Sequence, residues 1–233
     1  MFRYVAGWAR GKLHRRGTSH ELTLRLREVN LLIDTSRAEL NSYWEIWHER
    51  MYDKVPGFCP VEPDCVVDVG ANIGAFALYQ ACKKRAKAVI AFEPSPTVFK
   101  RLEANVALNG LRNITTVNAA VGDLCGSLPF LELPMSMNSR VAAGSELGAT
   151  IVPATTLDSS LLKLGVARVN LLKIDTEGYE THVLRGATGI LGLTERLIIE
   201  IHDETDKSEF QALLLPLGFQ LICSDAGLLF YSR

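Results

Sequence analysis

From about residue 65 to residue 217, short apolar runs alternate with segments in which apolar residues recur every three or four positions. Short apolar runs are typical of parallel strands buried on both faces, and the longer spacing is typical of helices. The runs predict strands at residues 66–70, 88–93, 114–121, 170–175 and 196–202. The segments between and after them predict helices near residues 74–84, 96–109, 179–191 and 208–217. This alternation predicts a doubly wound α/β domain with a mostly parallel sheet.

The helix at 96–109 has the clearest boundaries, with Ser95 as its N-cap and Gly110 at its C-terminal end. The last two apolar runs, residues 220–224 and 228–232, flank the turn sequence Asp225-Ala-Gly. A turn of this composition predicts a hairpin, so we expect the sheet to end with an antiparallel pair.

Residues 124–154 have little clear periodicity, and only Pro129–Pro134 and Ala149–Pro153 are expected to form short strands. A long irregular insertion in a compact domain is often a lid or a substrate-facing element. Its polar and flexible side chains are candidates for contact with a substrate, namely Met135, Met137, Asn138 and Arg140.

The segment before the first core strand predicts a helix at residues 37–52, with Ser36 as a possible cap. We therefore divide the chain into an extension at residues 1–36 and a domain at residues 37–233, whose core begins at residue 64. The aromatic residues of this helix predict a packing face. A less favoured interpretation places three of them over the site, Trp44, Trp47 and Tyr52.

The extension is basic, because residues 1–27 contain seven Arg or Lys residues and a single acid, Glu21. We interpret most of it as a solvated segment, and peripheral contact with an anionic surface is the alternative. Residues 21–27 alternate polar and apolar side chains, which predicts a half-buried edge strand.

Composition narrows the classes of protein to consider. The 233 residues are 48% hydrophobic, enough for a large core, and a net charge of -1 gives no indication of a nucleic-acid partner. The five cysteines are scattered and form no C-x-x-C pair, which predicts reduced thiols in a cytoplasmic protein. The sequence has no apolar run long enough for a transmembrane segment and no secretory signal.

The first core strand leads into a glycine turn whose pattern is D-x-G-x-N-x-G, formed by Asp68, Gly70, Asn72 and Gly74. A dinucleotide-binding turn needs a third glycine and binds a pyrophosphate, which a carboxylate repels. The acid instead suits a ligand with cationic groups. S-adenosylmethionine has an ammonium and a sulfonium group and no phosphate, so the pattern favours this ligand.

Five sequence blocks share their order and spacing with a known family: Val67–Gly74, Phe92–Pro96, Asn118–Asp123, Leu172–Glu180 and Ile199–His202. Over roughly residues 37–205 the chain resembles the FkbM family of S-adenosylmethionine-dependent methyltransferases. The resemblance implies the Rossmann-like class I methyltransferase fold, with a seven-stranded sheet whose last strand is antiparallel.

The resemblance also implies a set of cofactor-binding residues. The methionine end of S-adenosylmethionine is expected at the glycine turn, at Asp68, Gly70, Asn72 and Gly74. Glu93, at the end of the second core strand, is expected to accept hydrogen bonds from both ribose hydroxyls. The adenine edge is expected at Asn118, Ala119 and Asp123, although Asp123 also suits a turn, and Glu93 also suits a helix N-terminus.

The fourth and fifth core strands contain charged side chains where a central strand is usually apolar. If the two strands place these side chains on one face, Lys173 pairs with Glu200 and Asp175 pairs with His202. We predict His202 as the base that removes a proton from the acceptor, Asp175 as the group that fixes its tautomer, and Glu177 as a further catalytic residue. The alternative is that His202 is a hydrogen-bonded residue at a strand end.

Together these observations predict a methyltransferase, and the resemblance favours O-methylation of a hydroxyl group on a small molecule, sugar or glycan. Two alternatives remain open: an NAD(P)-binding oxidoreductase and a non-catalytic scaffold. Asp175, Glu177 and His202 could also hold a divalent cation, but the spacing is not diagnostic. We predict that the protein needs no metal.

Overall fold

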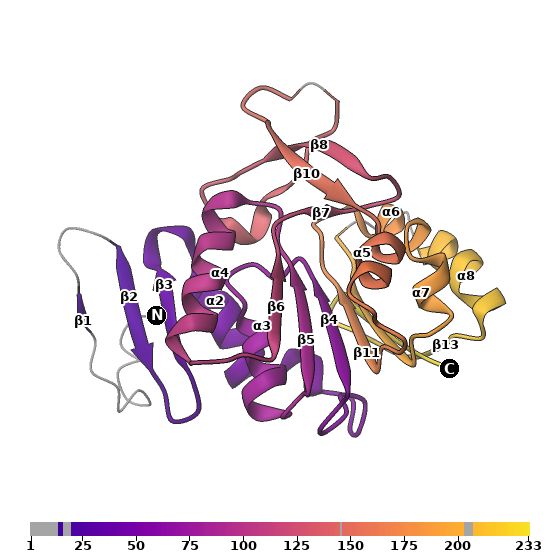
Figure 1. Ribbon diagram of the computed structural model, residues 1–233, viewed down its shortest axis with the longest axis horizontal. Helices are drawn as coiled ribbons and strands as arrows, with labels where there is room; N and C mark the ends of the chain where they lie inside the picture. The colour runs from indigo at the N-terminus through magenta and orange to yellow at the C-terminus, as the bar shows by residue number, and fades with distance from the viewer. Residues whose placement is uncertain (1–13, 16–19, 145, 203–206) are drawn as a thin grey trace.

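The computed structural model describes residues 14–15, 20–144, 146–202 and 207–233. Its centre is a seven-stranded sheet in the order β13-β14-β12-β11-β4-β5-β6 (Figure 1). The strands are β4 (Cys65–Val69), β5 (Ala88–Phe92), β6 (Ile114–Val117), β11 (Leu171–Ile174), β12 (Arg196–Glu200), β13 (Gln220–Asp225) and β14 (Leu228–Ser232). β14 is antiparallel to both of its neighbours, and the other described pairings of this sheet are parallel. The structure confirms the predicted doubly wound fold with an antiparallel last strand.

Helices cover both faces of this sheet, and each face has its own apolar core. One core packs α3 (Ala75–Leu78) and α4 (Pro96–Leu108) against the sheet. The other core packs the remaining core helices, α5 (Leu157–Lys163), α6 (Glu180–Arg185), α7 (Thr188–Leu191) and α8 (Lys207–Leu214). Neighbouring residues of one strand serve opposite cores, since Val66 lies in the first and Val67 in the second. This arrangement explains why the central strands are apolar on both faces.

Several predicted elements are shorter or divided. The helix at 74–84 continues from α3 into a π-helical turn, η4 (Tyr79–Lys83), and the helix at 208–217 ends in the 3-10 turn η7 (Leu215–Leu217). The helix at 179–191 is divided at Gly186 into α6 and α7. Gly186 lies so close to Gly122 that a Cβ there would overlap the backbone oxygen of Gly122. The helix at 96–109 is confirmed as α4, and the Ser95 side chain accepts the predicted capping hydrogen bond from Val98 N.

The predicted helix at 37–52 is wrong as a single element. The structure has η1 (Thr35–Arg37), α2 (Glu39–Tyr43), the π-helical η2 (Trp44–His48) and η3 (Met51–Asp53). Two non-glycine residues with left-handed backbones interrupt the series, Ala38 at φ 58° and Arg50 at φ 55°. The cap is Asp34, whose side chain accepts a hydrogen bond from Ser36 N, so Ser36 is not the cap.

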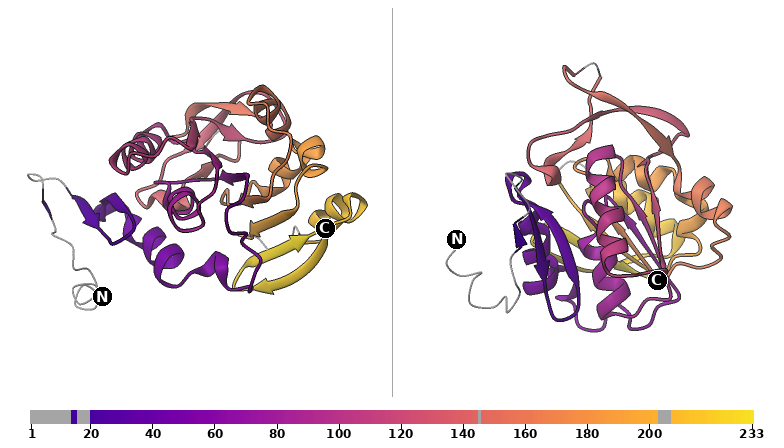
Figure 2. Two further views of the ribbon diagram at one scale, coloured as in Figure 1. Left: turned by 60° about the horizontal axis from the view of Figure 1, so that its bottom comes forward. Right: turned by 60° about the vertical axis from the view of Figure 1, so that its left-hand side comes forward.

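The N-terminal strands pack against α4 (Figure 2, right). β2 (Glu21–Arg25) confirms most of the predicted strand, but its predicted position at a sheet edge is wrong, because β2 is the middle strand of the sheet β1-β2-β3. It pairs with β3 (Asn30–Asp34), which was not predicted, and with the two-residue β1 (His14–Arg15). Leu24, Leu31 and Ile33 are buried in the core beneath α4. The division of the chain at residue 36 stays a prediction, and the rest of the basic extension lies outside the described residues.

Asn105 connects three parts of this region. Its buried amide accepts a hydrogen bond from Leu32 N at 2.6 Å and donates to Leu32 O at 3.1 Å and Ile73 O at 2.9 Å. We expect Asn105→Ala to lower the free energy of unfolding by about 3 kcal/mol, because buried backbone groups would lose their partners. Urea denaturation measures this change. Glu103→Ala on the exposed side of the same helix is the control, and an equal loss in both variants would contradict the assigned role.

The insertion forms a second sheet in the order β7-β10-β8-β9, which lies above the main sheet in Figure 1. Its elements are β7 (Ala120–Val121), β8 (Gly126–Leu131), η5 (Ser136–Asn138), β9 (Arg140–Val141) and β10 (Thr150–Thr155). β10 confirms the second short strand predicted here, and β8 overlaps the first but begins and ends three residues earlier. The strand predicted at 114–121 is divided, because β6 ends in the main sheet and β7 pairs with β10.

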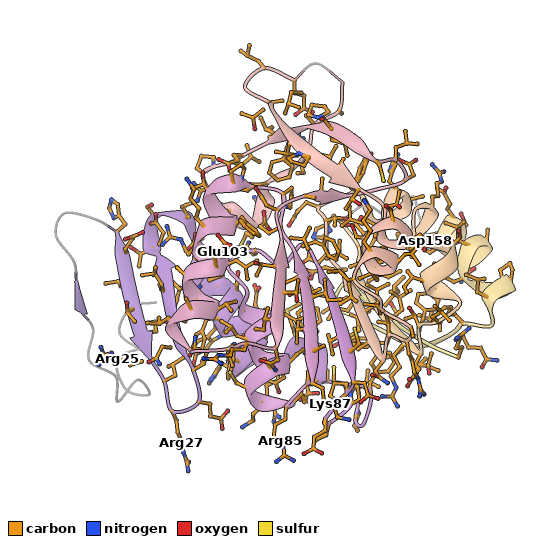
Figure 3. All side chains as sticks on the ribbon, viewed as in Figure 1. Arg25, Arg27, Arg85, Lys87, Glu103 and Asp158 are labelled. Carbon is orange, nitrogen blue, oxygen red and sulfur yellow. The ribbon has the colours of Figure 1, made fainter. Side chains whose placement is uncertain are left out.

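On the side of the molecule opposite this insertion, Arg85 and Lys87 project outward just before β5, as does Arg27 from the turn between β2 and β3 (Figure 3). No helix in the described ranges is both long and apolar enough to cross a membrane.

Candidate active site

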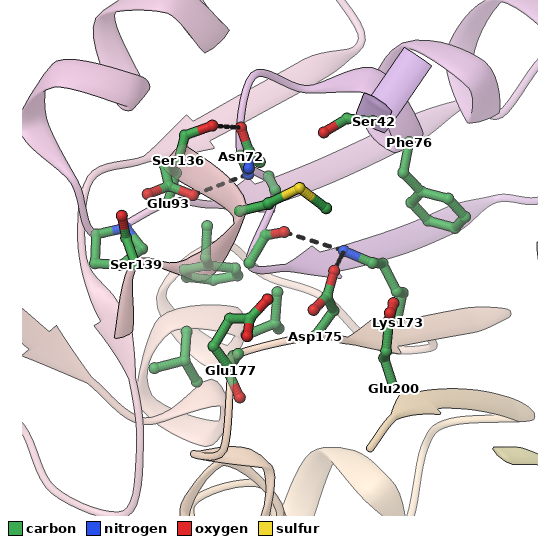
Figure 4. A pocket seen from close by; sticks show the side chains of 18 of the residues that line it. Ser42, Asn72, Phe76, Glu93, Ser136, Ser139, Lys173, Asp175, Glu177 and Glu200 are labelled. Carbon is green, nitrogen blue, oxygen red and sulfur yellow. Dashed lines mark hydrogen bonds and ion pairs between the residues drawn. The ribbon is translucent and has the colours of Figure 1, made fainter. Parts of the chain in front are cut away.

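A pocket lies at the carboxyl ends of the central strands, between the main sheet and the insertion (Figure 4). Four strand ends supply its base, those of β4, β5, β11 and β12. The N-terminal helical segments supply one wall through Ser42, Glu45 and Tyr52. The insertion supplies another through Phe130 and the stretch around Ser136. Ligands of open α/β sheets bind at this edge, so the pocket is the candidate site.

The glycine turn after β4 forms one side of the pocket. Gly70 has φ +76° and lies against the backbone of the next strand, so that a Cβ there would overlap Asp175 O. Gly74 has φ +87° and a Cβ there would overlap Leu102 of α4. Gly70 and Asn72 line the pocket, whereas Gly74 allows close packing of the turn on α4. Gly70 therefore forms part of the pocket, and Gly74 allows the turn to lie against α4.

Glu93 lies at the carboxyl end of β5 with its carboxylate at the pocket (Figure 4). The carboxylate accepts hydrogen bonds from Asn72 N and Ser95 N, each at 2.9 Å. Burial raises the pKa of Glu93 to about 7, although these two hydrogen bonds and Lys173 lower it in part. The side chain is 7% exposed, so the carboxylate is held in one position for a ligand.

The three residues predicted at the adenine edge have different positions. Ala119 lines the pocket together with Ala120 and Val121. The side-chain amide of Asn118 donates to Glu93 O at 2.8 Å, so it supports the turn after β5. Asp123 is not among the residues that line the pocket, and its charge acts on Tyr179, which does line it.

The predicted pair of Lys173 and Glu200 is wrong. Lys173 Nζ lies 3.1 Å from an oxygen of Asp68 and 3.1 Å from an oxygen of Asp175, and it donates to Gly70 O at 3.0 Å. The cause is the strand register, since Lys173 is directly opposite Asp68 on β4 and opposite Ile198 on β12. Asp68 itself is fully buried and does not line the pocket. Its predicted contact with the cofactor stays a prediction.

Glu200 instead has a partner on the N-terminal segment. Its carboxylate accepts a hydrogen bond of 2.9 Å from the hydroxyl of Tyr52, and both residues line the pocket. Burial and the charge of Asp175 raise the pKa of Glu200 to about 7, although Lys173 lowers it in part. Of the three aromatic residues considered as a cover for the site, only Tyr52 lines the pocket. Trp47 donates to Ala75 O, and Trp44 donates to Glu49.

His202 is surrounded by acids. Its Nε2 lies 3.7 Å from Asp175 and 3.4 Å from Glu177, and its Nδ1 lies 3.3 Å from Glu180. Burial alone would lower the pKa of His202, but the hydrogen bond with Glu180 and the charges of the other two acids raise it to about 9. The predicted proximity of Asp175 and His202 is confirmed. A base must be unprotonated, and the three acids instead stabilise the imidazolium, so this geometry does not favour the predicted role of His202 as the base.

Glu177 lines the pocket, whereas His202 is not among the lining residues. Burial raises the pKa of Glu177 to about 7, while the nearby His202 opposes part of the increase. Its backbone is in the left-handed region at φ 54°, which is uncommon for a non-glycine residue. A side chain held at such a position in a pocket is a candidate functional group.

Sequence reasoning missed most of the wall formed by α2 and η2. Ser42, Glu45 and Ile46 line the pocket at the (i, i+3, i+4) spacing of one helix face. This spacing could have identified the three residues as one helix face at the site. The aromatic residues of the same segment instead led to the prediction of a packing face. Of the residues proposed in the insertion, Met137 lines the pocket, while Arg140 forms an ion pair of 2.9 Å with Glu146.

The sequence matches the Methyltransferase FkbM domain over residues 68–221. The chain belongs to the FkbM methyltransferase family. The hexuronic acid methyltransferase AglP of Haloferax volcanii is 32% identical over 154 residues, which cover 66% of this chain. The match covers 62% of AglP, so the chain spans less than two thirds of that relative. The 31-O-demethyl-FK506 methyltransferase FkbM of Streptomyces tacrolimicus is 29% identical, and the match covers 77% of this chain and 81% of that relative.

Solved structures support the fold of this FkbM-family chain. Methyltransferase FkbM from Methylobacillus flagellatus has a TM-score of 0.52 and 18% identity, with 87% of this chain and 56% of that one covered. M. jannaschii TYW2 in complex with AdoMet has a TM-score of 0.52 and 16% identity, with 94% of this chain and 89% of that one covered. At such low identity these two structures bear on the fold alone.

Proposed function

We propose that this FkbM-family protein is an S-adenosylmethionine-dependent O-methyltransferase that acts on a hydroxyl group of a small molecule, sugar or glycan. The observation that carries the proposal is the buried carboxylate of Glu93, held at the pocket beside the glycine turn by two backbone N–H groups. A carboxylate at the end of the second core strand is suited to the two hydroxyls of a ribose.

The residues of the pocket fit S-adenosylmethionine chemically. Phe92, Ala119 and Val121 offer apolar surface for an adenine ring next to Glu93. The carboxylates along the pocket suit a ligand with ammonium and sulfonium groups and oppose the pyrophosphate of NAD(P). When bound, this cofactor would supply a methyl group activated by a positively charged sulfur.

A ligand comparison tests the proposal. We expect S-adenosylhomocysteine to raise the melting temperature of the protein and NAD to leave it unchanged, because a ligand stabilises a protein only where it binds the folded state. Differential scanning fluorimetry at several ligand concentrations measures both. Stabilisation by NAD alone would favour the oxidoreductase alternative, and no stabilisation by either ligand would favour a scaffold.

The chain's own residues must then position the acceptor and remove its proton. We assign the proton acceptor to Glu177, since it lines the pocket and its pKa of about 7 suits a general base near neutral pH. His202, as an imidazolium, would hold Asp175 and Glu177 in place and would balance their charge. Asp175 would act through its ion pair with Lys173, which fixes the end of β11 beside the glycine turn.

A metal ion is the alternative means of activating the acceptor. Asp175, Glu200 and His202 each offer a ligand atom, and these atoms lie within 4.8 Å of one another. Lys173 Nζ lies 3.1 Å from Asp175 and would oppose a divalent cation there. We therefore expect dialysis against EDTA to leave methyl transfer unchanged. Formation of S-adenosylhomocysteine with and without added Mg²⁺ measures this, and activity restored only by the metal would overturn the metal-independent mechanism.

The oxygen acceptor is supported by the relatives' names. One relative is named as a hexuronic acid methyltransferase and another as a 31-O-demethyl-FK506 methyltransferase, and the second name specifies an oxygen that lacks its methyl group. A cytoplasmic location and the absence of a nucleic-acid partner stay predictions from the sequence.

A further inference from the structure

Glu45 lies in the wall of the pocket formed by the N-terminal helical segments. It belongs to the π-helical η2, and it lines the pocket with Ser42, one turn earlier on the same helix face. The side chain is half-buried. Burial raises the pKa of Glu45, and the negative charges of Glu49 and Asp175 raise it further. A positively charged or hydrogen-bonding partner would stabilise a carboxylate in such surroundings.

The other acids of the pocket have such partners within the protein. Glu93 accepts two backbone hydrogen bonds, and Glu200 accepts one from Tyr52. Asp175 forms an ion pair with Lys173, and Glu177 lies 3.4 Å from the imidazole of His202. For Glu45 the described ranges provide no hydrogen-bond or ion-pair partner. Its carboxylate is therefore available to a ligand.

The same pocket has no free cation among its described lining residues. Lys173 is the single basic residue there, and its ammonium group is held by Asp68, Asp175 and the carbonyl oxygen of Gly70. The rings of Tyr52 and Phe76 lie 5.7 Å and 5.8 Å from this ammonium group and limit its movement further. An acceptor with a carboxylate would thus meet several acids and no available basic group.

We propose that Glu45 binds a protonated amino group of the acceptor, so that the substrate is an amino alcohol or amino sugar whose hydroxyl is methylated. This inference rests on the proposed O-methyltransferase function and names its substrate class. The amino group is the anchor, and the hydroxyl is the nucleophile that loses its proton to Glu177. An acceptor of this class is opposite in charge to the hexuronic acid named for AglP.

Three ring compounds of similar size test the inference: trans-2-aminocyclohexanol, trans-cyclohexane-1,2-diol and trans-2-hydroxycyclohexanecarboxylic acid. Each has one hydroxyl beside a substituent that is cationic, neutral or anionic. With S-adenosylhomocysteine bound to the protein, ligand-observed NMR measures their affinities. We expect the amino alcohol to bind about 10-fold more tightly than the diol, and the acid to bind most weakly. A 10-fold difference in affinity corresponds to about 1.4 kcal/mol of binding free energy.

Glu45→Gln should remove this preference while the affinity for S-adenosylhomocysteine stays unchanged. Glu103→Gln is the control, because Glu103 is an exposed acid on α4 that does not line the pocket, whereas the charge of Glu49 acts on Glu45 itself. The inference is overturned if the amino alcohol does not bind, if the three probes bind equally, or if Glu45→Gln keeps the preference. A methylated nitrogen in the product would also overturn it. If S-adenosylhomocysteine itself does not bind, the proposed function fails first.

Discussion

Replacing Glu177 with glutamine should lower the turnover of methyl transfer by about 10²–10⁴-fold, the usual contribution of a positioned general base. The amide has nearly the same shape but cannot accept a proton at neutral pH. The affinity for S-adenosylmethionine should stay nearly unchanged, because Glu177 is assigned to the acceptor. Formation of S-adenosylhomocysteine gives the turnover, and calorimetry gives the affinity. A folded Glu177→Gln protein with normal turnover would contradict the assignment.

The pH profile distinguishes Glu177 from His202 as the base. The base must be ionised, and burial raises the pKa of Glu177 to about 7, so turnover should increase as the pH rises through about 7 and then stay level. If His202 were the base, turnover would increase only as the pH approached about 9, where its imidazolium loses its proton. We expect His202→Ala to reduce turnover less than Glu177→Gln does and to move the profile toward higher pH. The shift follows because Glu177 would lose the positive charge that lowers its pKa.

Replacing Glu93 with alanine should weaken the binding of S-adenosylmethionine by about 100-fold or more. Two hydrogen bonds to an ionised carboxylate contribute about 1.5–3 kcal/mol each, and about 1.4 kcal/mol is a factor of ten. The substitution also removes the acceptor for Asn72 N, so the glycine turn would lose one of its supports. Isothermal titration calorimetry measures the effect, and Glu93→Gln should retain part of the affinity.

Glu132→Gln is the control for this prediction. Glu132 is an acid near the N-terminus of α4 that contacts Ser95 and Thr97 and does not line the pocket. It should bind S-adenosylmethionine as the unaltered protein does. Equal affinities in the Glu93→Ala and Glu132→Gln proteins would remove Glu93 from the proposed cofactor site.

The central fold could be predicted because its signals are local. The strands from Cys65–Val69 to Arg196–Glu200 are short, mainly apolar runs, and the Ser95 cap is a single side chain with a known preference. The broken N-terminal helix could not be predicted in the same way. Its interruptions at Ala38 and Arg50 place ordinary residues in left-handed conformations, which tertiary contacts must stabilise.

The site was predictable as a set of residues but not as a set of contacts. Residues Gly70, Asn72, Glu93, Ala119, Asp175 and Glu177 all line the pocket, as their places after strands suggested. The predicted partner of Lys173 was Glu200 on the neighbouring strand β12. In the structure the residue opposite Lys173 on β12 is Ile198, two positions before Glu200, and Lys173 pairs with Asp68. The charge of His202 depends on Glu180, an acid at the start of α6 whose contact with His202 no local sequence pattern indicates.

The close contact between Gly70 and the carbonyl oxygen of Asp175 has a consequence for changing the specificity of this protein. The turn after β4 and the end of β11 have no space between them, so a side chain added to one must displace the other. Variants made in this region would alter cofactor binding and proton removal together. The wall that includes Ser42 and Glu45 and the loop around Ser136 belong to other segments of the chain. Libraries that seek new acceptors should therefore vary those two segments and keep the glycine turn intact.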